Sequence, residues 1–248
     1  MKLRIWLMAV GSIFGNLGYS QQLSPRLVKK EAVIQSVSVL PAHIEMRRGG
    51  MKGAEGMTEI SEVLTLKVRA AVEKELARRK VSTIPAAKPP QEQDEASKHA
   101  LADVQQKFDG IRGLLAKTPK DVAKGKFTLG DSVAEFHPVQ PAETLVFLRG
   151  AGSVPTKGKV GLGILVAAAA GGGAGAAVMG PNSFSADIAF VDAKTGEVLA
   201  LTSLRTTGSM VTKTIGNEEK TLAPSVDKNL EKLVTKAMKK VPLIGDKK

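Results

Sequence analysis

A helix flanked by two strands is the sequence feature that most constrains the fold of this chain. Apolar residues between Thr58 and Lys80 recur at the three-and-four spacing of one helical face. Residues 33–40 alternate in polarity before Pro41, which is typical of a strand, and residues 81–84 follow the helix as a second, shorter strand. This β-α-β unit predicts an α/β fold.

The rest of the chain extends this pattern into a single α/β domain. A β-hairpin is expected near 186–203, with Gly196 in its turn, and an amphipathic helix from about Ser225 to Lys240. We therefore predict a mixed β-sheet with flanking helices. The other expected elements are a Gly-rich loop at 49–56, a Pro-rich loop at 85–95, a helix at 95–116 and a strand at 143–149. The domain is expected to span 33–242, between a flexible N-terminus at 21–32 and a flexible tail at 243–248.

The first 20 residues have the layout of a secretory signal peptide. A basic start is followed by an apolar run at 5–17 and by small residues at Gly18 and Ser20, so cleavage is expected near Ser20. The chain has no Cys, which excludes lipid attachment, disulfides and thiolate metal ligands. We expect a non-lipidated protein that is periplasmic or associated with the outer membrane.

A second apolar stretch, rich in Gly and Ala, covers residues 160–180. It carries no charge from Val160 to Met179 and is long enough to cross a bilayer, but its glycines disfavour a helix. An ordinary apolar hairpin, a membrane-inserted segment and a contact between subunits all remain open. The candidate contact residues are Leu162, Ile164, Leu165, Val166 and Val178.

The chain is basic, with a formal net charge of +12. Its C-terminal helix places five lysines opposite the apolar stripe, at Lys228, Lys232, Lys236, Lys239 and Lys240. These lysines form either a solvated surface or a contact for a polyanion or an anionic membrane surface. Nucleic acid is disfavoured because both Trp6 and Tyr19 precede the expected cleavage site, which leaves only Phe for base stacking.

Catalytic motifs are incomplete. Ser132, after Gly130 and Asp131, resembles the nucleophile of a serine esterase, but the only downstream imidazole is His137, five residues away. The other histidines, His43 and His99, do not form a metal-binding motif with it. We expect no enzyme activity, no cofactor and no metal, and keep a hydrolase using Ser132 as an alternative.

The pattern resembles a group of bacterial envelope proteins, the curli-secretion (CsgG-like) and TolB amino-terminal-domain-like α/β proteins. The likeness rests on the strand at 37–41, the helix and strand at 58–84, the strand at 145–148 and the hairpin at 190–199. The resemblance implies an exported, non-catalytic binding or assembly component. Its partner would be another envelope protein or a second copy of the chain, with contact to the membrane surface as a further possibility.

Overall fold

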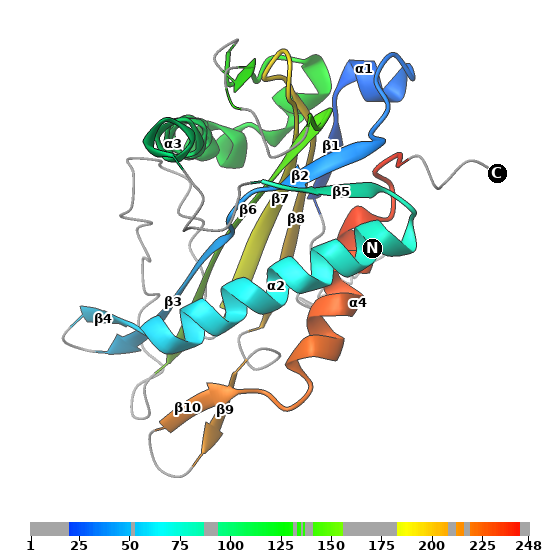
Figure 1. Cartoon of the computed structure of the whole chain (residues 1–248). Coiled ribbons are helices and arrows are strands. Elements are labelled where there is room, and N and C mark those ends of the chain that lie inside the picture. Colours follow the sequence, from blue (N-terminus) through cyan, green and yellow to red (C-terminus); the bar gives the residue numbers. More distant parts are fainter. Residues whose placement is uncertain are drawn as a thin grey trace, which may run out of the picture.

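The computed structural model describes residues 20–50, 53–86, 94–130, 133–134, 136, 141–155, 183–207, 212–215 and 219–243. An eight-stranded mixed sheet forms its centre, with α2 (Thr58–Arg78) and α4 (Val226–Met238) on one face and α3 (Glu95–Lys117) on the other (Figure 1). The strands of this sheet are β1 (Ser20–Leu23), β2 (Ser36–Val39), β3 (His43–Gly50), β4 (Gly53–Gly56), β5 (Ser82–Pro85), β6 (Thr144–Pro155), β7 (Ser183–Asp192) and β8 (Val198–Thr207). The predicted α/β class with a mixed sheet is confirmed.

The β-α-β unit forms as predicted. β2 pairs in parallel with β5, Ser36 opposite Ser82, and α2 crosses between them. The helix begins at Thr58, and Met57 before it makes no side-chain capping bond. At the other end, Lys80 adopts a left-handed φ of 57°, as the chain turns from α2 into β5.

Two consecutive strands share one edge of β6. β2 pairs in parallel with residues 144–146 of β6, and β3 pairs in parallel with residues 149–155. β3 then forms a hairpin with β4, so the loop expected at 49–56 is partly wrong. Pairing with β6 supplies backbone hydrogen bonds that a Gly-rich segment could not gain from local contacts alone.

The outer edge of β3 is closed by hydroxyl groups of α2. The amide of Ile44 donates to Thr65 Oγ1 at 3.1 Å, and the amide of Met46 donates to Ser61 Oγ at 2.9 Å. A groove of about 700 Å³ lies beside these bonds, between β3 and the first half of α2.

The strands β6, β7 and β8 form an antiparallel meander that is longer than the sequence predicts. Near its end, Gly152 leaves room for Met46, which is fully buried. A Cβ atom at residue 152 would lie 2.3 Å from Met46 Sδ. The glycine therefore permits close packing between β6 and β3.

The segment at 21–32, which we expected to be flexible, contains regular structure. β1 pairs with β8, and α1 (Pro25–Val28) buries Leu27 in the core. Arg26 Nη1 lies 3.0 Å from Asp192 Oδ2 and 3.0 Å from Glu197 Oε2, which attaches α1 to the β7–β8 turn. These contacts join residues far apart in sequence, so local polarity did not predict them.

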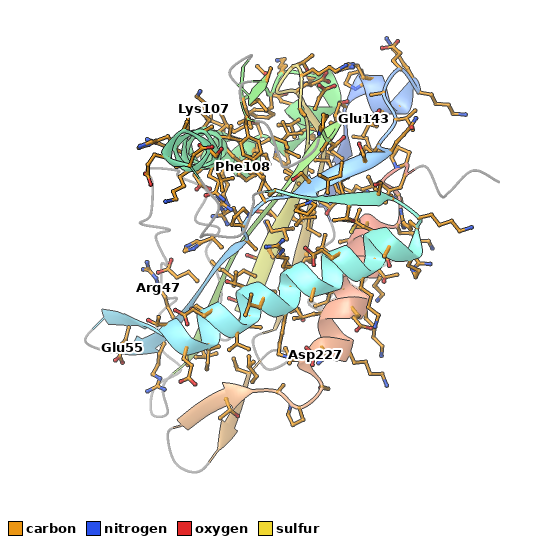
Figure 2. All side chains as sticks on the ribbon, viewed as in Figure 1. Arg47, Glu55, Lys107, Phe108, Glu143 and Asp227 are labelled. Atoms are coloured by element: carbon orange, nitrogen blue, oxygen red, sulfur yellow. The ribbon has the colours of Figure 1, made fainter. Side chains whose placement is uncertain are left out.

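Two hydrophobic clusters fill the two faces of the sheet. One lies under α2 and α4, and the other lies under α3, where Phe108 stacks on Phe147 with ring centroids 4.3 Å apart. Figure 2 shows Phe108 on the side of α3 that faces the sheet. Next to it, the buried Arg149 binds Asp109 at 2.7 Å and also donates to the carbonyl of Pro41. This arginine joins α3 to the turn between β2 and β3.

The smaller elements complete the described chain. A 3₁₀ helix spans Pro119–Lys124, and β9 (Thr212–Ile215) pairs with β10 (Glu219–Leu222) in a separate two-stranded sheet that the sequence analysis missed. Leu243, placed at the start of the expected tail, is buried and bridges to Ile34. None of the helices described here has the length and apolar composition required to span a membrane.

Candidate functional site

The C-terminal helix α4 presents a lysine face opposite its buried face. Its buried side chains are Val226, Leu230, Leu233, Val234, Ala237 and Met238. At about 100° per residue, they cluster on one side of the helix, and the predicted lysines occupy an arc of about 120° on the other side. All five, at Lys228, Lys232, Lys236, Lys239 and Lys240, are exposed. We call these five residues the lysine face.

The acidic residues of α4 bind α2 instead of the lysines of their own helix. Asp227, in the first turn of α4 (Figure 2), accepts a bond from Lys67 Nζ at 2.6 Å. One turn later, Glu231 accepts a bond from Lys74 Nζ at 2.7 Å. Two α2 lysines are thus paired with the carboxylates nearest the lysine face. The positive charge of α4 is therefore separated from its negative charge.

Four lysines of the face make no ion pair within the described residues. These are Lys228, Lys232, Lys239 and Lys240. Lys228 stands three residues before Glu231, a spacing at which helical side chains meet, yet the carboxylate of Glu231 binds Lys74. The positive charges of these four lysines are therefore available to an anionic ligand.

The helix dipole accounts for the lysines at only some positions of the lysine face. Lys239 and Lys240 follow the last turn of α4, where a cation is stabilised by the negative end of the dipole. Lys228 lies in the first turn, where the dipole disfavours a cation. Lys228 and Lys232 also repel each other at the i,i+4 spacing. Intrahelical electrostatics therefore give no reason for lysine at these two positions.

A buried carboxylate fixes α4 against α2. Glu75 is 3% exposed, and its oxygens accept bonds from Arg78, Arg79 and the hydroxyl of Thr235 at 2.7–2.9 Å. Burial alone would raise the pKa of Glu75, but the bonds from Arg78 and Thr235 and the charges of both arginines outweigh burial and lower that pKa below its ordinary value of 4.5. Arg79 also donates to the carbonyl of Val241 at 3.0 Å, so the C-terminal ends of α2 and α4 are joined.

The other predicted site residues do not gather with the lysine face. His43 is exposed on β3 and His99 is exposed on α3. In the part of the chain that the structure describes, no group of three or more His, Asp or Glu side chains could hold a metal ion. Ser132, His137, the signal-like residues 1–19 and the candidate contacts Leu162, Ile164, Leu165, Val166 and Val178 lie outside the described residues.

The sequence indicates the lysines of α4, but not the residues that hold the acidic side chains away from them or that fix the helix in place. Asp227 and Glu231 are four residues apart and flank the lysine positions, which is a signal that could have indicated an acidic edge facing another helix. The roles of Glu75 and Thr235 depend on contacts 160 residues apart. No local pattern indicates such a pair.

Comparisons with known proteins give distant structural likenesses. No family model matches the chain, and no curated protein matches it significantly. The PelC dodecamer from Paraburkholderia phytofirmans is 11% identical, covering 91% of this chain and 97% of that chain with a TM-score of 0.37. The LpoB C-terminal domain from Salmonella enterica is 15% identical, covering 75% and 96%, with a TM-score of 0.27. Such low values establish no family, and the resemblance to CsgG-like proteins remains a prediction.

Proposed function

We propose that this protein is an exported, non-catalytic envelope component that binds an acidic partner through the lysine face of α4. The observation that carries the proposal is the separation of charge on α4, where both acids bind lysines of α2 and four outward lysines have no ion pair within the described residues. The signal-like N-terminus supports export.

The rigid attachment of α4 favours a preformed binding surface. Its apolar stripe is buried against the sheet, and Glu75 and Thr235 tie it to α2. The lysine side chains are therefore displayed from a fixed backbone, so binding requires ordering of the side chains but no folding of the helix.

Binding is tested by retention on heparin resin and on beads coated with lipopolysaccharide. The face variant replaces Lys228, Lys232, Lys239 and Lys240 with Gln, and the control variant replaces Lys98, Lys117, Lys120 and Lys126, which are exposed elsewhere. Both variants lose the same formal charge. We expect salt-sensitive retention of the wild type and the control, and weaker retention of the face variant on at least one matrix. Equal retention of all three proteins on both matrices would refute the proposal.

Export and the absence of catalysis have separate tests. N-terminal sequencing of protein from the periplasmic fraction should begin near Gln21, and an intact Met1 would contradict cleavage. Because the only Trp is Trp6, the cleaved protein should lack tryptophan fluorescence. A fluorophosphonate probe should leave Ser132 unmodified, whereas an adduct there would favour the hydrolase alternative.

A further inference from the structure

The lysine face has the shape of a narrow track along one helix. From Lys228 to Lys240 the track is about 18 Å long, at about 1.5 Å of rise per residue. Asp227 and Glu231 border it on the side of α2, where their carboxylates pair with Lys67 and Lys74. The positive surface is therefore long in the direction of the helix axis and limited in width on that side.

The helix lacks an apolar anchor for a bilayer. Helices that lie in a membrane interface insert an apolar face between the lipid headgroups. The apolar stripe of α4 instead packs on the sheet, and the large exposed hydrophobic side chains of the described chain lie elsewhere, at Val28, Val33, Val63, Leu66 and Leu114. Contact of α4 with a membrane would thus rest on charge alone.

The C-terminal end of α2 carries one more exposed cation close to the end of α4. The C-terminal ends of α2 and α4 converge (Figure 1). The bonds of Glu75 to Thr235 and of Arg79 to Val241 hold these ends together. The exposed Lys80 follows directly after Arg79 at this end of the molecule. Lys80 therefore adds a further positive charge at the end of the molecule where α4 finishes.

We infer that the partner of the lysine face is a linear, flexible polyanion that lies along α4, rather than a bilayer surface. This inference rests on the proposed function and specifies its ligand class. A flexible chain can follow a track one helix wide and place successive anionic groups beside successive lysines, whereas a bilayer would find no apolar anchor on this helix.

The test compares inorganic polyphosphate, tripolyphosphate and phosphatidylglycerol vesicles as probes of the purified protein, at equal accessible phosphate. Long-chain polyphosphate should bind at least tenfold more tightly than tripolyphosphate, which is too short to span the track, and more tightly than the vesicles. If four lysines are neutralised, with a salt slope of about 0.7 per charge, the affinity for polyphosphate should fall about 50-fold between 50 and 200 mM salt.

The face and control variants show where the polyphosphate binds. The face variant should lose the preference for long chains, and the control variant should retain it. Equal binding of the two phosphate polymers, tighter binding of vesicles, or equal losses in both variants would overturn the inference. If the face variant loses retention on heparin or lipopolysaccharide while the wild type prefers vesicles, the proposed function stands and only the ligand class is wrong.

Discussion

Replacing Glu75 with Gln should weaken the attachment of α4 to α2 and destabilise the fold. The substitution removes the charge that compensates Arg79, whose side chain is 6% exposed and cannot easily gain water, whereas that of Arg78 is 61% exposed. Removing one partner of a buried ion pair typically costs about 3–5 kcal/mol. Because Gln retains one acceptor oxygen, we expect the free energy of unfolding to fall by about 3 kcal/mol.

The matched control for this prediction is Glu73→Gln on the same helix. Glu73 pairs with Arg69 at 2.8 Å, but both side chains are more than one-third exposed, so the expected loss is about 0.3–0.5 kcal/mol. Urea unfolding followed by far-ultraviolet circular dichroism measures both losses. If Glu75→Gln costs no more than Glu73→Gln, the assigned role of Glu75 is wrong.

The pH dependence gives a second measurement on Glu75. Its pKa is lower in the folded protein than the ordinary value of 4.5, so its carboxylate stabilises the fold above that value. This stabilisation is lost as the pH falls from about 4.5 through the folded pKa. The difference in unfolding free energy between wild type and Glu75→Gln should therefore shrink on acidification, and a difference independent of pH would contradict the linkage.

Three further substitutions test other parts of the structure. Changing Lys228 and Lys232 to Gln should leave stability unchanged or raise it by up to about 1 kcal/mol in urea unfolding, because repulsion and an unfavourable dipole contact are removed; a clear loss would mean that these lysines stabilise the fold. Gly152→Ala should cost about 1–3 kcal/mol, since the new methyl group meets Met46, and an unchanged urea midpoint would show that the site has spare room. Arg149→Met should cost about 2–3 kcal/mol through loss of charged hydrogen bonds, and a thermal melt like that of wild type would contradict this role.

The sequence predicted the elements whose patterns are local. The helix at 58–78 and the helix at 226–238 repeat apolar residues on one face, and the hairpin around Gly196 joins two apolar strands. Each pattern can be recognised within one segment because burial on one face requires a fixed spacing of apolar side chains. These elements alone are sufficient to indicate an α/β fold.

The elements that the sequence missed depend on pairing across the chain. β1 has only four residues, three of them polar, and becomes a strand by pairing with residues 200–203 of β8. β4 is a Gly-containing strand supported by β3, which in turn pairs with β6. Intrinsic strand propensity is weak for such residues, so the tertiary partner determines the conformation.

The candidate site was predictable in its lysines but not in its electrostatics. Helical periodicity places Lys228 and Lys232 opposite the buried stripe, and the structure agrees. Whether a nearby acid neutralises them depends on where the carboxylates of Asp227 and Glu231 point, and α2 decides this by supplying Lys67 and Lys74. The local charge pattern allows either arrangement.

The two hydroxyl bonds beside β3 have a consequence for self-association. An unpaired strand edge offers amides on which another chain can add a strand, and many proteins block such edges with lysine or proline. Here the amides of Ile44 and Met46 already donate to the hydroxyl groups of Thr65 and Ser61. Helix α2 therefore covers this part of the strand edge. A strand from another molecule could therefore pair with this stretch of β3 only after these two hydrogen bonds to α2 were broken.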